Sequence, residues 1–101
     1  MGVALVSSER QKMTMCSDGL TKLMEECGEL VQIAAKKQAY THTDIHPDGK
    51  GSLKKRLEDE IADVSAACAF VIATFELDDN RINERASRKL ALFLKWHTQQ
   101  D

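Results

Sequence analysis

Proline occurs once in this sequence, at position 47, and only five of its 101 residues are glycine. Because these two residue types interrupt helices most strongly, their scarcity favours long helices over a sheet with many turns. Half of these helix breakers lie in one segment, 41–51, where Pro47 and two glycines fall together with histidine and aspartate. This composition predicts a loop, and the chain as a whole predicts an all-α fold.

The segments around this loop have the apolar periodicity of helices. Ser52 follows the loop directly and is a favourable N-cap for the segment after it. Ser8 opens a capping-box pattern, which predicts a short helical segment near the N-terminus. We expect three main helices, over residues 20–40, 52–75 and 81–96.

The stretch 64–75, VSAACAFVIATF, is apolar on nearly every face. A helix of this kind needs neighbours on all sides, and three helices of one chain supply too few. We therefore predict a single domain, residues 1–101, whose four-helix-bundle-like core is completed in a homo-oligomer, either a dimer or a tetramer. The open alternative is a monomer that tolerates alanine and cysteine at its surface.

The composition excludes several classes of partner. Fourteen lysines and arginines stand against 16 acidic residues, for a formal net charge of -2. We expect no nucleic-acid partner, because the basic excess that such binding requires is missing. We expect no membrane partner, because no apolar run approaches the roughly 20 residues of a membrane span. The three cysteines, odd in number and widely spaced, fit a reducing compartment and predict a cytoplasmic protein.

The first two long helices place acidic residues at the same position relative to their apolar stripes. Glu26 and Glu29 lie one turn apart on the shoulder of the first stripe, and Glu60 and Asp63 lie likewise on the second. If the two helices pack antiparallel through their stripes, both acidic shoulders line one groove beside the seam.

Four carboxylates at partial burial repel one another, and a cation relieves this repulsion. No histidine lies at helical spacing from them, so the ligands are oxygen atoms, which suit Mg²⁺, Mn²⁺ or Ca²⁺ better than zinc or copper. The pattern therefore predicts a divalent-metal site. The open alternative is a solvated acidic face balanced by lysine or arginine.

Two motifs in this pattern resemble a known family. EECGEL at 25–30, followed by EIADV at 60–64, is similar to the EExxE…ExxD signature of the all-α NTP pyrophosphohydrolases, the superfamily of MazG and the dimeric dUTPases. The chain resembles its short, single-domain MazG-like members, including those of phages, over residues 20–96. The resemblance implies hydrolysis of a nucleoside triphosphate to the monophosphate and pyrophosphate with Mg²⁺, for which Mn²⁺ can substitute.

The resemblance also implies roles for individual residues. Glu25 orders the attacking water or acts as its base, or it is only the solvated partner of a lysine. The metal ligands are Glu26, Glu29, Glu60 and Asp63. The candidates for contact with the substrate are Lys22, Arg56, Lys89, Lys95 and Trp96. For Lys22 and Arg56, the alternative is that they only balance the carboxylates. For Lys89 and Lys95 it is that they are solvated lysines, and for Trp96 that it packs against a neighbour.

The sequence leaves the preferred base open, with dGTP, dATP and non-standard nucleotides all compatible. A dimeric dUTPase proper is a second enzyme hypothesis, for which the chain is short. The alternative outside enzymes is a non-catalytic, oligomeric helical adaptor or regulatory module that docks a partner through its acidic face. The matching i, i+3 pairs favour the enzyme, because a docking surface has no need of them.

Overall fold

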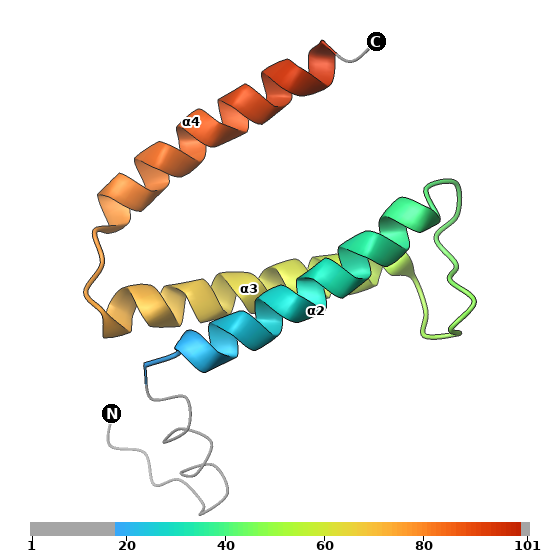
Figure 1. Ribbon diagram of the computed structural model, residues 1–101, viewed down its shortest axis with the longest axis horizontal. Coiled ribbons are helices and arrows are strands. Elements are labelled where there is room, and N and C mark those ends of the chain that lie inside the picture. The colour runs from blue at the N-terminus through green and yellow to red at the C-terminus, as the bar shows by residue number, and fades with distance from the viewer. Residues whose placement is uncertain (1–17, 100–101) are drawn as a thin grey trace, which may run out of the picture.

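The computed structural model describes residues 18–99 as three helices (Figure 1). They are α2 (Leu20–Ala39), α3 (Leu53–Thr74) and α4 (Asp79–Thr98). Within this range the only extended pairing is a single antiparallel bridge between Ile45 and Ser52. The predicted all-α fold is confirmed, with helix bounds within two residues of those expected. The helical segment predicted near Ser8 lies outside the described residues.

Side-chain caps fix where two of the helices begin. The Ser52 hydroxyl accepts a hydrogen bond from the backbone N–H of Lys55 at 3.2 Å, so the predicted cap of α3 is confirmed. The Asp78 carboxylate accepts from the backbone N–H of Arg81 at 3.0 Å and caps α4. Each cap satisfies one of the amide groups that the first turn of a helix leaves unpaired.

The start of α2 depends on a glycine instead. Gly19 has φ 81°, in the left-handed region, and a Cβ atom there would come within 2.6 Å of Phe70 Cδ1 and 3.1 Å of Val71 Cγ2. Glycine is the residue that meets both constraints without strain. The contact joins the N-cap residue of α2 to the C-terminal part of α3, so the two helices run antiparallel (Figure 1).

The loop between α2 and α3 is fastened to the start of α3. Asp44 accepts hydrogen bonds from the Ser52 hydroxyl and from the backbone N–H of Lys54, the latter at 2.7 Å. The Tyr40 and His46 rings meet edge to face, with centroids 4.8 Å apart. The predicted loop is therefore an ordered connection with internal side-chain contacts.

The seam between α2 and α3 is rotated away from the centre of the apolar stripes, toward the acidic shoulders. Ile33 and Glu26 are the buried residues of α2, whereas Met24 and Val31, on the other edge of the stripe, are 67% and 68% exposed. Of the four acidic shoulder residues, Glu26 lies in the seam itself, whereas Glu29 and Asp63 are exposed. Each helix consequently keeps one apolar edge uncovered.

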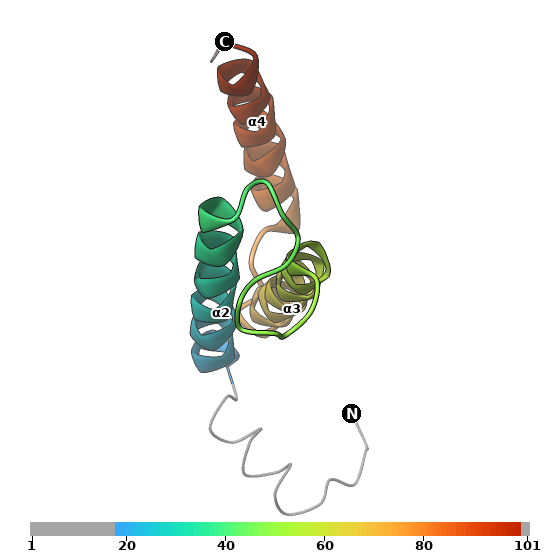
Figure 2. The ribbon, with the colours of Figure 1, turned by 90° about the vertical axis from the view of Figure 1, so that its right-hand side faces the viewer.

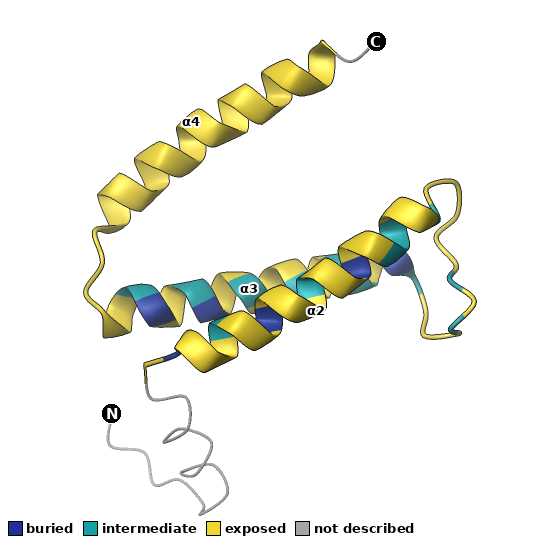
Figure 3. Cartoon of the chain, in the orientation of Figure 1, coloured by how far each residue is buried: buried dark blue, intermediate teal, exposed yellow. Residues whose placement is uncertain are grey.

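Helix α4 lies apart from the α2–α3 pair (Figures 1 and 2) and is exposed along its length (Figure 3). The chain bends away from α3 at Glu76, which has φ 51°. The Cα radius of gyration is 17.3 Å, whereas about 13 Å is usual for a compact domain of 100 residues. The exposed large apolar side chains of α4 are Ile82, Leu90, Leu92, Phe93, Leu94 and Trp96.

The exposed apolar residues do not form a helix that could cross a membrane. Between residues 18 and 99, no helix has the length and apolar character that a membrane crossing requires. The described fold thus leaves one face of each helix without a partner from its own chain.

Candidate metal centre

The α2–α3 pair brings together the four carboxylates that the sequence singled out. Glu26 and Glu29 come from α2, and Glu60 and Asp63 come from α3. One oxygen of each residue lies within 4.8 Å of the corresponding oxygens of the other three. An i, i+3 pair on each of two antiparallel helices produces this convergence, since residues three apart share a helix face.

Two of these carboxylates have an oxygen that no group among residues 18–99 satisfies. Glu26 is 7% exposed, Glu60 is half-buried, and Oε2 of each is buried without a hydrogen-bond partner. Glu29 and Asp63 are exposed. A buried carboxylate oxygen without a partner is costly, so the cluster lacks a positively charged or hydrogen-donating group at its centre.

The pKa of Glu60 reflects the same burial and crowding of carboxylates. Burial raises the pKa of its carboxyl above the ordinary glutamate value, and the negative charges of Glu29, Asp63 and Glu26 raise it further. A divalent cation at this point would reverse each of these effects, because it favours the ionised form of every carboxylate around it. The donor set consists of oxygen atoms, as Mg²⁺ and Mn²⁺ prefer.

Lys22 supplies part of the missing positive charge. Its Nζ lies 3.1 Å from Glu26 Oε1 and 3.6 Å from Glu25 Oε2, and its side chain is 56% exposed. The hydrogen bond to Glu26 and the negative charges of Glu26 and Glu25 raise the pKa of Lys22. Of the two roles considered for Lys22, its contacts in this structure correspond to balancing the carboxylates. Glu25 is exposed beside this lysine and is not one of the four carboxylates that converge.

Arg56 is held by a residue that the sequence reasoning missed. Its Nη1 and Nη2 donate to Oδ1 and Oδ2 of Asp48, each at 3.1 Å. Lys36 Nζ donates to the same carboxylate at 3.0 Å, and His46 Nδ1 accepts from the Asp48 backbone N–H at 3.0 Å. The Asp48 side chain is 18% exposed, and hydrogen bonding to Arg56 holds its pKa well below the usual range.

A cavity of about 350 Å³ adjoins the carboxylate cluster. Its volume lies within the range of about 300 to 1,000 Å³ that is usual for ligand pockets. Glu29 and Glu60 belong to both the cluster and the cavity wall. The other residues of the wall are Gln32, Ile33, Lys36, Lys50, Arg56 and Asp59.

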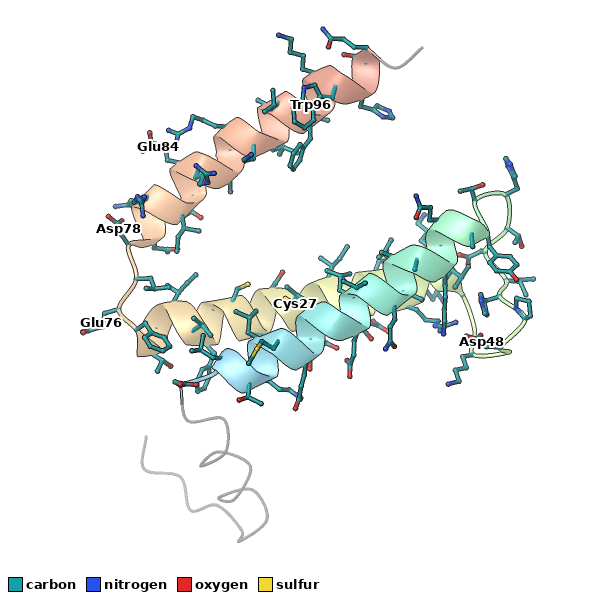
Figure 4. The ribbon with its side chains drawn as sticks, in the orientation of Figure 1. Cys27, Asp48, Glu76, Asp78, Glu84 and Trp96 are labelled. Atoms are coloured by element: carbon teal, nitrogen blue, oxygen red, sulfur yellow. The ribbon has the colours of Figure 1, made fainter. Side chains whose placement is uncertain are left out.

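The three candidate substrate contacts on the last helix, Lys89, Lys95 and Trp96, lie far from this cluster within one chain. All three side chains are exposed on α4, which does not pack along α2 or α3 (Figures 1 and 4). Trp96 lies beside Phe93, with ring centroids 5.7 Å apart. Contact of these residues with a substrate stays a prediction, and it requires α4 of a second chain or another position of α4.

No family model, no curated protein and no solved structure matches this chain. The geometry of the site and the motifs of α2 and α3 are therefore the observations that bear on its function.

Proposed function

We propose that this protein is a Mg²⁺-dependent nucleoside triphosphate pyrophosphohydrolase, which converts a nucleoside triphosphate and water into the monophosphate and pyrophosphate. One observation carries the proposal: four carboxylates meet within 4.8 Å, and Glu26 and Glu60 each have a buried oxygen without a partner. The resemblance of the α2 and α3 motifs to MazG-like proteins supports the reaction class.

In the proposed reaction, Glu26, Glu29, Glu60 and Asp63 hold Mg²⁺, and Mn²⁺ can substitute. When bound, the ion supplies the positive charge that the polyphosphate and the attacking water require. The water oxygen forms a bond to the α-phosphorus, and the bond from that phosphorus to the bridging oxygen breaks, so that pyrophosphate leaves. Glu25, which pairs with the same lysine as the cluster residue Glu26, orders the attacking water or takes its proton.

The same proposal includes a homo-oligomer, a dimer or a tetramer, in the cytoplasm. The uncovered apolar surface supports the oligomer, since Val31 of α2, Ile61 of α3 and Phe93 of α4 are each more than half exposed. Cys27 and Cys68 are free thiols, in keeping with a reducing compartment.

Product analysis tests the reaction directly. Purified protein is incubated with each of the four dNTPs, dUTP and the ribonucleotides, in Mg²⁺ and in EDTA. We expect monophosphate and pyrophosphate from at least one nucleotide in Mg²⁺, and no product in EDTA. Diphosphate and orthophosphate would overturn the bond that we assign, and no turnover of any nucleotide would favour the adaptor module instead.

A further inference from the structure

The cavity beside the carboxylate cluster has a basic wall that the proposed chemistry at the metal does not use. Lys36, Lys50 and Arg56 line it, together with Asp59 and the two cluster residues Glu29 and Glu60. If Glu29 and Glu60 are neutralised by a metal ion, the three cations of the wall stand against two carboxylates, that of Asp59 in the wall and that of Asp48, which pairs with Lys36 and Arg56. Such a wall attracts an anion.

Asp48 holds two of these cations without exhausting their hydrogen-bonding capacity. Arg56 gives two of its five N–H donors to Asp48, and Lys36 gives one of its three. One negative charge therefore faces two positive charges, and donors remain for a ligand. Because Asp48 fixes both side chains, they line the cavity before any ligand arrives, which lowers the entropic cost of binding.

Lys50 reaches the cavity from the loop. It lies between Gly49 and Gly51, whose φ angles are 70° and 96°, and its backbone N–H donates to Asp48 Oδ1 at 3.1 Å. The loop conformation that presents Lys50 is thus attached to the same carboxylate as Lys36 and Arg56. Asp48 thus holds the side chains of Lys36 and Arg56 and the backbone of Lys50.

We infer that this cavity binds the β- and γ-phosphates of the nucleoside triphosphate, with Lys36, Lys50 and Arg56 as their ligands and the α-phosphate at the carboxylate cluster. This inference rests on the proposed function and adds the orientation of the triphosphate relative to the carboxylate cluster. Its physical basis is that Glu29 and Glu60 are shared between cluster and cavity, so one polyphosphate chain can bridge both.

The test measures binding of inorganic pyrophosphate, inorganic tripolyphosphate and a nucleoside monophosphate by calorimetry in Mg²⁺. Lys50→Met should weaken pyrophosphate and tripolyphosphate binding about tenfold or more, because each loses a charge-assisted contact, and leave monophosphate binding unchanged. Lys55→Met is the matched control, because Lys55 is an exposed lysine of α3 outside the cavity wall.

A second variant and further measurements distinguish loss of a phosphate contact from loss of the fold or of metal binding. Lys36→Met should act as Lys50→Met does, and both should raise KM for the triphosphate more than they lower kcat. Circular dichroism checks the fold, and the Mg²⁺-induced rise in melting temperature should be the same as in the unaltered protein.

Each possible result then supports or contradicts the cavity assignment, the orientation of the substrate or the proposed function. Pyrophosphate and tripolyphosphate binding unaffected by both variants would overturn the cavity assignment, even if Mg²⁺-dependent turnover upheld the proposed function. Weakened monophosphate binding in place of pyrophosphate binding would overturn the direction of the substrate. Loss of tripolyphosphate binding in a protein that hydrolyses no nucleotide would uphold the polyphosphate site and overturn the proposed function alone.

Discussion

Arg56 and Asp48 form a bidentate pair, with both nitrogen–oxygen distances at 3.1 Å. The pair joins α3 to the loop, and the hydrogen bond from Lys36 joins the same carboxylate to α2. Three parts of the fold therefore meet at one aspartate, which holds two basic residues of the cavity wall. This arrangement makes the stability of the loop depend on the charge of Asp48.

The dependence of the free energy of unfolding on acid pH should reveal the contribution of the Arg56–Asp48 pair. The pKa of Asp48 is lowered in the folded protein, chiefly by its hydrogen bonds to Arg56, relative to about 3.9 in an unfolded chain. Its contribution is therefore complete above about pH 4 and is lost as the pH falls through the folded-state pKa. Asp48→Asn should lower the free energy of unfolding at pH 7 and flatten its decline below about pH 4.

Urea unfolding followed by circular dichroism at several pH values measures both effects. Glu58→Gln is the control, because Glu58 is an exposed acid of α3 outside the cluster and the cavity wall. An Asp48→Asn variant with the same acid dependence as the unaltered protein would show that the pair contributes nothing to the fold.

Metal binding should stabilise the folded chain. A metal ion that binds the assembled carboxylates and not the unfolded chain raises the free energy of unfolding by about 2.7 kcal/mol at a concentration a hundred times its Kd. Thermal melts with Mg²⁺, with Mn²⁺ and with EDTA measure the shift. Equal midpoints at millimolar metal and in EDTA would contradict the site.

Removal of a single cluster carboxylate should separate activity from folding. Glu29→Ala and Asp63→Ala should each abolish turnover, because each removes a proposed metal ligand from an exposed position. The metal-free variants should melt at the same temperature as the unaltered protein or higher, since repulsion around Glu60 decreases. Near-normal activity of either variant would remove that residue from the ligand set.

Two glycines of the α2 region provide a matched pair of substitutions. Gly19→Ala should destabilise the fold by about 1 to 3 kcal/mol, because residue 19 has φ 81° and its Cβ would overlap the Phe70 ring. Gly28→Ala should stabilise it by about 0.5 to 1 kcal/mol, because Gly28 is in the middle of α2 and nothing lies within 4 Å of its Cβ position. Chemical unfolding of both variants gives the comparison, and equal stabilities would contradict the close contact at Gly19.

The exposed apolar face of α4 should control the oligomeric state. The unaltered protein should elute as a dimer or tetramer in size-exclusion chromatography with light scattering. Phe93→Glu should shift it to the monomer, since Phe93 is 53% exposed in a single chain and a charge there opposes burial in an interface. Ala91→Glu introduces the same charge on the opposite face of α4 and should leave the oligomer intact. A monomer of the unaltered protein at micromolar concentration would overturn this prediction.

Local signals in the sequence were sufficient for the helices and for the meeting of the carboxylates. Ser52 caps α3 as its position after the loop predicts, because capping depends only on the residues of the first turn. The wheel positions of Glu26 and Glu60 likewise follow from helix geometry alone. Once α2 and α3 pack antiparallel, these positions put the four carboxylates together.

The centre of the seam and the contacts of the loop depend on information that periodicity does not contain. Periodicity identifies the apolar residues of a helix but not which neighbouring element each of them faces. It therefore does not predict that Ile33 is buried and Val31 is exposed. Asp48, Lys36 and Lys50 meet through the path of a loop, which has no repeating pattern from which side-chain contacts follow. Nor does any local signal indicate that α4 lies apart from the pair.

The loop that Asp44 fastens to the start of α3 has a consequence for how quickly the site forms. The carboxylate cluster and its cavity come from a single helical hairpin, residues 20–74, so closing the one loop between α2 and α3 brings their parts together. The entropy cost of closing a loop grows only slowly with its length, and most of the other contacts of the hairpin are local contacts within its two helices. The hairpin can therefore complete its folding before α4 meets another chain, and assembly would begin from a protomer whose acidic cluster is already formed.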